Sequence, residues 1–154
     1  LTGSLKVPKE LVLDFVVAFA KFENCAKTLR LIEDNTSRPV VSWQKVSLRI
    51  DGAFQRKVQS DEALRQLVEW LKREPPQKQV IVDGRPGFRS VFPSGQNDTE
   101  VLLVLVARIR NNLFHGSKGF ERDDAVRDED LLTAGLKLIH EFVASDSGLE
   151  EHFN

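Results

Sequence analysis

Apolar residues recur at helical spacing through most of the chain. The first such segment runs from about Pro8 to Ile32. Additional valines widen its apolar stripe beyond one face, which predicts a second apolar contact for this helix. The stripe itself consists of Leu11, Phe15, Ala18, Phe19, Phe22, Cys25, Ala26 and Leu29.

Two further helices are expected in the next part of the chain. Turn-forming residues at 34–39 separate them from the first helix. Residues 42–54 have the helical pattern, and Gly52 weakens the end of that segment. Residues 60–62, Ser-Asp-Glu, are typical of a helix start, with a capping residue and acid in the first turn. The prolines at 75–76 end this third helix.

Residues 75–98 are rich in Gly and Pro and predict one long irregular loop, within which residues 79–82 can form a short strand. A segment of this length without regular structure is often functional or mobile. Its basic and aromatic residues can bind RNA through phosphates and base stacking. Alternatively, the aromatics anchor the loop to the core, which is the more common arrangement. The residues concerned are Lys78, Arg85, Phe88, Arg89 and Phe92.

A fourth helix is expected from Asp98 to about His115, with Gly116 as its carboxyl-terminal cap. Six consecutive aliphatic residues, 101–106, make every side of it apolar. Such a helix lies at the centre of a bundle or is shared between the core and a partner subunit. A last helix follows from about residue 128 and is closed by residues 145–148. The pattern predicts an all-α fold, an antiparallel bundle of four to five helices.

Composition is that of a globular protein of 154 residues, 41% hydrophobic and 29% charged. We expect a single domain over residues 5–148, with an expression remnant at 1–4 and a tail at 149–154. The lone Cys25 excludes an internal disulfide and favours a reducing, cytoplasmic location. No apolar run is long enough for a membrane span, so no membrane partner is expected.

The net charge of −1 is unevenly distributed. Residues 1–120 contain 19 Lys and Arg against 13 Asp and Glu, whereas residues 121–154 contain 3 against 10. A locally positive cleft is therefore compatible with the nearly neutral total. Solvated helix faces of mixed sign explain the same distribution equally well.

Candidate chemistry is concentrated at the end of the expected fourth helix. The sequence has no Gly-rich phosphate loop and no zinc-binding motif, and its histidines are scattered, so neither a metal nor a cofactor is expected. By contrast, a run of polar side chains ends a helix that is otherwise aliphatic. The polar residues are Arg108, Arg110, Asn111, Asn112 and His115.

In this segment the chain resembles the HEPN (higher eukaryotes and prokaryotes nucleotide-binding) family. The family's ribonuclease motif is an Arg, often followed by Asn, and then a His after four to six residues. Arg110, Asn111 and His115 match it with four intervening residues. The match extends loosely to Glu23, because members often have an acidic residue on the first helix. About ten residues match at motif level, whereas the order of helices is similar over most of the chain.

The resemblance implies a metal-independent endoribonuclease. Arg110 and His115 would be catalytic, Asn111 and Glu23 supporting, and Arg108 and Lys118 would bind RNA phosphates. An imidazole can move a proton to or from the 2′-hydroxyl or the 5′-oxygen, and a guanidinium can stabilise the charged phosphorane. The products would be a 2′,3′-cyclic phosphate and a 5′-hydroxyl. The helix dipole favours a protonated His115, which suits a general acid.

Helix geometry constrains this site. Positions five apart on a regular helix differ by about 140° in direction, so Arg110 and His115 do not point the same way. Asn111 and His115, four apart, share a face, so Asn111 can orient the imidazole. Either the helix distorts near its end or two chains assemble one site. We expect the second, a homodimer.

Other interpretations remain open. Arg, Asn and His near a helix end also stabilise its last carbonyl groups, and surface cations are usually solvated. The function expected from the resemblance is RNA cleavage in a toxin–antitoxin or antiviral defence system, with an antitoxin or a fused domain as a possible partner. The alternative is a noncatalytic module that dimerises or binds nucleotide or RNA within a larger protein. A purely structural interaction domain is the third interpretation.

Overall fold

The computed structural model describes residues 7–114 and 125–154. Within these ranges the chain forms six helices and one two-stranded antiparallel sheet. In chain order they are α1 (Lys9–Thr28), α2 (Trp43–Ser60), α3 (Glu62–Arg73), β1 (Lys78–Val82), β2 (Arg85–Arg89), α4 (Asp98–Phe114), α5 (Ala125–Ala144) and α6 (Ser147–Phe153). The predicted all-α bundle is confirmed, with a small hairpin added. None of the described helices is both long and apolar enough to cross a membrane.

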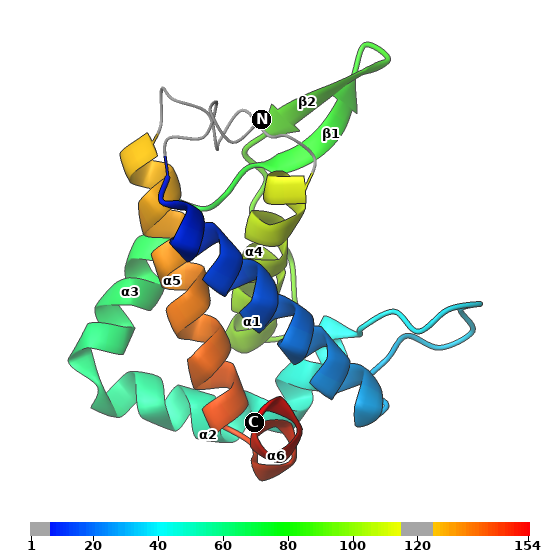
Figure 1. Cartoon of the computed structure of the whole chain (residues 1–154), viewed down its shortest axis with the longest axis vertical. Helices are drawn as coiled ribbons and strands as arrows, with labels where there is room; N and C mark the ends of the chain where they lie inside the picture. Colours follow the sequence, from blue (N-terminus) through cyan, green and yellow to red (C-terminus); the bar gives the residue numbers. More distant parts are fainter. Residues whose placement is uncertain (1–6, 115–124) are drawn as a thin grey trace.

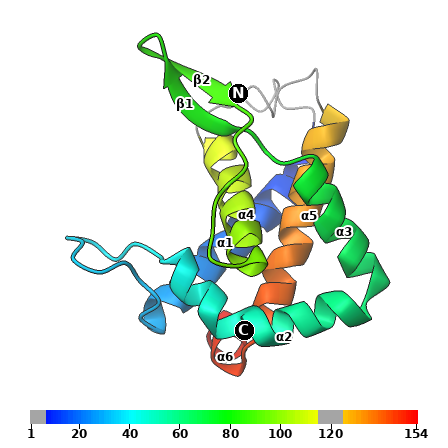
Figure 2. The ribbon, with the colours of Figure 1, turned by 180° about the vertical axis from the view of Figure 1, so that it is seen from behind.

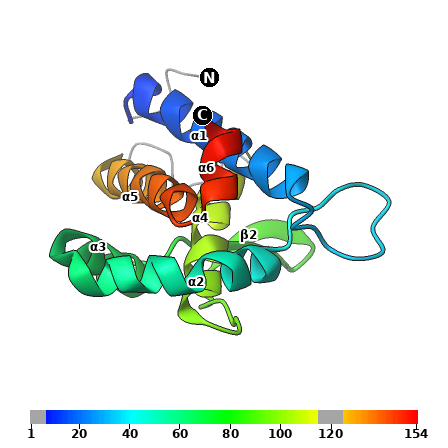
Figure 3. The same ribbon diagram turned by 90° about the horizontal axis from the view of Figure 1, so that it is seen from below.

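The helices are arranged in layers around α4 and α5. Figure 3 shows these two helices between α1 on one side and α2 with α3 on the other. Figure 1 shows the hairpin projecting beyond the bundle, next to the carboxyl end of α4. Residues 101–103, 105, 106 and 109 of α4 are all buried and spread over about 200° of the helix circumference, more than the single face of a surface helix. The prediction of a central helix is therefore confirmed, and its last turns lie between α1 and the hairpin.

Local capping interactions set several helix boundaries. The Ser42 hydroxyl accepts a hydrogen bond from the Lys45 amide, and the Asp61 carboxylate accepts one from the Leu64 amide, as is usual at helix starts. The second helix does not end near Phe54 as expected but continues to Ser60. Gly52 faces solvent, where a glycine weakens a helix without breaking it.

The expected tail is instead a short helix that belongs to the core. The Asp146 carboxylate accepts a hydrogen bond from the Leu149 amide at 3.0 Å and caps α6. Leu149 and Phe153, four apart, are buried on the same face. Residues 145–148 therefore end α5 and also start another helix, so that residues 149–153 pack against the bundle.

The expected long irregular loop at 75–98 contains the hairpin. Lys78 pairs with Arg89, and Val82 pairs with Arg85 next to the turn. The turn is Asp83-Gly84, and both residues have positive φ, 51° and 76°. Two such residues form the turn whose twist matches that of antiparallel strands. The possible strand at 79–82 is confirmed as part of β1, whereas the prediction of irregular structure was wrong for 85–89, because this turn lets the two short segments satisfy each other's backbone groups.

Residues 90–97 have no regular secondary structure, and they run back along α4 to its amino-terminal end (Figure 2). Phe92 on this segment is 54% exposed, so it does not anchor the segment to the core. Pro93 is buried beside it. The segment ends at Asn97, whose side chain accepts a hydrogen bond from the Glu100 amide and caps α4.

Candidate functional site

The first component of the site is Arg110, near the carboxyl end of α4. Its Nη2 lies 3.7 Å from Oε1 of Glu23 on α1, and its Nη1 donates to Oδ1 of Asn111 at 3.0 Å. Its Cζ atom lies 5.5 Å from the ring centroid of Phe19. Phe19 and Glu23 are four residues apart and so share one face of α1. The structure thus brings together three of the residues predicted for the site, Arg110, Asn111 and Glu23.

The contacts of Arg110 with α1 orient its guanidinium without burying it. The side chains of Arg110 and Glu23 are 36% and 25% exposed. At 3.7 Å their ion pair is a charge–charge contact beyond usual hydrogen-bond length. Such partly exposed pairs contribute only about 0–1 kcal/mol, and an exposed cation–π contact about 0.5–1 kcal/mol. Arg110 therefore has a defined direction at the surface of the bundle, where an anionic ligand can reach it.

Two predicted site residues, His115 and Lys118, lie outside the described residues, as does the expected cap Gly116. Helix α4 is described as far as Phe114. The meeting of the Arg110 guanidinium with an imidazole, within one chain or between two, stays a prediction. The expected role of Asn111 changes in part, because its side-chain oxygen accepts from Arg110. In the described structure it supports the guanidinium.

Arg108 has a different environment from Arg110. Residues two apart on a helix differ by about 200° in direction, so the side chains of Arg108 and Arg110 leave α4 on nearly opposite sides. Arg108 is only 8% exposed. Its Nη1 donates to the carbonyl oxygen of Val91, on the segment that runs along α4. Burial lowers the pKa of the Arg108 guanidinium, but an arginine stays charged in proteins.

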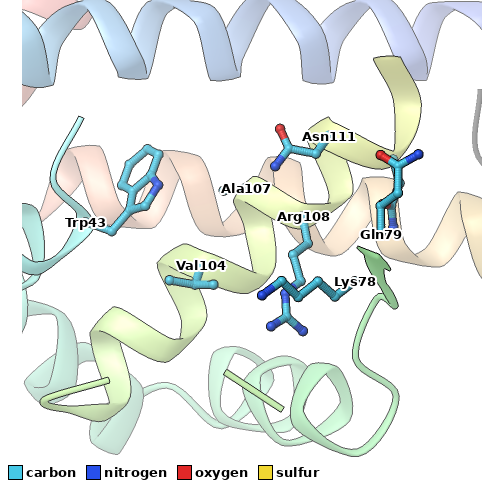
Figure 4. A pocket seen from close by; sticks show the side chains of 8 residues that line it. Trp43, Lys78, Gln79, Val104, Ala107, Arg108 and Asn111 are labelled. Carbon is cyan, nitrogen blue, oxygen red and sulfur yellow. The ribbon is translucent and has the colours of Figure 1, made fainter. Parts of the chain in front are cut away.

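Arg108 also lines a pocket of about 420 Å³ beside the end of α4. Figure 4 shows its walls: α4 in the middle, Trp43 from the start of α2 at one end, and the first residues of β1 at the other. The volume is within the range of about 300–1,000 Å³ that is common for ligand sites. The lining residues are Trp43, Lys78, Gln79, Val104, Ala107, Arg108, Asn111 and Asn112.

Several of these residues were not predicted to contribute to a site. Trp43 fits the apolar stripe of α2, and its sequence position gives no sign that it reaches α4. Asn112 is buried, and its side-chain amide donates to the carbonyl of Gln77 at 3.0 Å, which fixes the base of the hairpin to α4. Lys78 was noted as a basic loop residue. The missed signal was the Asp83-Gly84 pair, which predicts the hairpin and with it the position of Lys78.

The described part of the chain has no group of three or more His, Cys, Asp or Glu side chains arranged to hold a metal ion. Comparison with protein-family models, with curated proteins and with solved structures gave no match. The functional argument therefore depends on the residues themselves.

Proposed function

We propose that this chain is a metal-independent endoribonuclease whose active site is built from Arg110 and His115. The observation that carries the proposal is the environment of Arg110. This guanidinium projects from the last turns of the central helix α4, contacts Glu23 and Phe19 on α1, and stays about one third exposed. The position suits a group that has to meet a phosphodiester in a fixed orientation.

The proposed reaction is an internal transfer. The ribose 2′-hydroxyl gives its proton to a solvent water as its oxygen bonds to the adjacent phosphorus. The bond from phosphorus to the 5′-oxygen then breaks, and that oxygen takes a proton. An imidazole at His115 would supply this proton, and the Arg110 guanidinium would donate two hydrogen bonds to the phosphorane oxygens. The step balances without a metal or an external nucleophile.

The neighbours of Arg110 have supporting roles in this scheme. The Glu23 carboxylate and the Asn111 side-chain oxygen keep the guanidinium on the α1 side of the helix. The Arg110–Glu23 contact is weak, so a phosphate can compete with Glu23 for the guanidinium. As positions five apart on a helix diverge, we propose that the Arg110 of one subunit and the His115 of another share each site in a homodimer.

The test is single-turnover cleavage of unstructured RNA in EDTA. Arg110→Ala is expected to lower the rate about 10²- to 10³-fold, the usual effect of losing one transition-state donor. His115→Ala is expected to lower it about 10²- to 10⁴-fold. Arg56→Ala removes an equally charged, exposed side chain from α2 and should leave the rate unchanged. Unfolding curves for each variant separate lost chemistry from lost structure.

The pocket beside Arg108 favours a second candidate, a noncatalytic module that binds RNA or nucleotide. That function predicts binding that survives His115→Ala and no cleavage by the wild-type protein. Cleavage by wild type that persists in both the Arg110→Ala and His115→Ala variants would instead indicate a contaminating nuclease, and the proposal would then be wrong.

A further inference from the structure

The pocket beside α4 contains a buried positive charge that has no acidic partner among the described residues. Within residues 7–114 and 125–154, no Asp or Glu oxygen lies within 4.0 Å of the Arg108 guanidinium. Its described acceptor is the neutral Val91 carbonyl. Buried charges are usually paired, because losing hydration is costly. Lys78 lines the same pocket from β1, so the pocket has the charge to bind an anion.

The other end of the pocket offers an aromatic surface. Trp43 is half-buried and packs against two rings of α1, with centroids 5.9 Å away for Phe19 and 5.8 Å for Phe22. A ring held in this way keeps its orientation, and an indole face is a suitable platform for a nucleobase. The side-chain amides of Gln79 and Asn111 also line the pocket, and amides can bond to base edges.

The pocket adjoins the proposed catalytic group. Asn111 lines the pocket and also accepts a hydrogen bond from Arg110 at 3.0 Å. The Asn111 side chain therefore lies between Arg110 and the pocket, and a strand that contacts Arg110 would pass Asn111 and turn around α4 to reach Arg108. Lys78 is exposed at the base of the hairpin, and Figure 4 shows it on the same side of α4 as the Arg108 guanidinium.

We propose that this pocket binds one nucleotide of single-stranded RNA next to the scissile phosphate. Arg108 and Lys78 hold the nucleotide's phosphate, and Trp43 holds its base. This inference rests on the proposed ribonuclease function, and it states how that site binds its RNA substrate. The pocket suits an unpaired nucleotide, because the base of a single strand can turn away from its neighbours and stack on an aromatic side chain. Base pairing in a duplex prevents this. The pocket thus makes the chain selective for single strands.

The test uses 2′-O-methyl hexauridylate, which has the phosphates and bases of RNA and no 2′-hydroxyl to attack. Binding is followed by the fluorescence of Trp43 in a Trp70→Phe background, in which Trp43 is the single tryptophan. We expect quenching on binding. Lys78→Ala should weaken affinity about fivefold at 0.1 M salt and reduce the salt slope by about 0.7, the effect of one lost phosphate contact on a single strand.

Two comparisons make this test specific. Arg85→Ala removes a charge from the tip of the same hairpin, outside the pocket, and should change affinity less than Lys78→Ala. Trp43→Leu, followed by anisotropy of a labelled strand, should weaken binding by fivefold or more, and Trp43→Phe should restore part of it. Unfolding curves exclude a variant that has lost its fold. Arg108→Lys should bind more tightly than Arg108→Met.

The pocket proposal is wrong if Trp43 fluorescence does not respond, or if Lys78→Ala and Arg85→Ala lose affinity equally, as on a general basic surface. It is also wrong if uridine monophosphate binds as tightly as the hexamer, because the site then serves free nucleotides. If the wild type cleaves RNA and the pocket variants show none of these effects, the pocket proposal is refuted and the ribonuclease proposal stands. If all of these effects on binding are seen but the wild type does not cleave RNA, the pocket proposal is supported and the ribonuclease proposal is refuted.

Discussion

The packing that positions α4 against α1 can be tested at one glycine of α5. A Cβ atom at Gly135 would lie 2.7 Å from Cε1 of Phe15 on α1 and 3.2 Å from Cδ1 of Ile109 on α4. Carbon atoms normally pack about 3.5–4.0 Å apart, so Gly135→Ala forces a shift of nearly 1 Å in a buried contact. Ile109 is the immediate neighbour of Arg108 and Arg110. The substitution should therefore disturb both proposed binding groups.

Gly52 provides a matched control on the exposed face of α2. A Cβ atom there would lie 3.5 Å from Nη1 of Arg56, an ordinary contact with a flexible side chain. Replacing Gly by Ala inside a helix contributes about 1 kcal/mol of stability at either position. This contribution cancels in the comparison. The remaining difference is the overpacking at Gly135, about 1–3 kcal/mol.

The assay is thermal unfolding followed by circular dichroism. For a chain of 154 residues, each kcal/mol shifts the midpoint by about 2–4 °C. Gly52→Ala should raise Tm by a few degrees, and Gly135→Ala should unfold about 2–12 °C below Gly52→Ala. Equal stabilisation by both substitutions would refute the close approach of α5 to Phe15 and Ile109.

Three further predictions concern other parts of the molecule. Burial raises the pKa of the Cys25 thiol above its ordinary value of 9.0, so the unfolded chain releases that proton first as pH rises. The free energy of unfolding should therefore fall above pH 9.0. In urea unfolding, a Cys25→Ala variant should lose less of this free energy per pH unit than the wild type. The same loss in both proteins would contradict the prediction. Asp61→Ala removes the acceptor for the first turn of α3 and should lower the free energy of unfolding by about 1 kcal/mol, so an unchanged urea midpoint would argue against the cap. Glu23→Gln should slow RNA cleavage by no more than about fivefold, because such a pair contributes up to about 1 kcal/mol; a loss as large as that of Arg110→Ala would give Glu23 a direct chemical role.

The sequence predicted most helices well because strong local signals mark them. Asp61 and the prolines after α3 are cap and stop signals that act within a few residues. The aliphatic run in α4 predicted a central helix, and the structure confirms this for five of its six residues, whereas Val104 is partly buried and lines the pocket. Helix α6 was missed because it is only seven residues long and places just two apolar side chains, Leu149 and Phe153, in the core.

The hairpin and the pocket were harder to predict for different reasons. Strand β2 contains Pro86 and Gly87, which are unfavourable in strands and therefore obscure the turn signal at Asp83-Gly84. The pocket depends on tertiary approach, since Trp43 and Arg108 are far apart in sequence. The Glu23–Arg110 contact also joins distant segments; Glu23 could be expected to pair with an arginine, but local patterns do not say which one.

Cleavage through the 2′-hydroxyl, promoted by Arg110, is the central claim. It is tested most directly by end-group analysis of the products from a single-stranded RNA and from the same strand carrying a 2′-O-methyl group at the cleaved position, both in EDTA. The account predicts 2′,3′-cyclic phosphate and 5′-hydroxyl ends from the first strand, no cut at the methylated position, and loss of both products in Arg110→Ala. A 5′-phosphate product, or a cut at the methylated position, would contradict it.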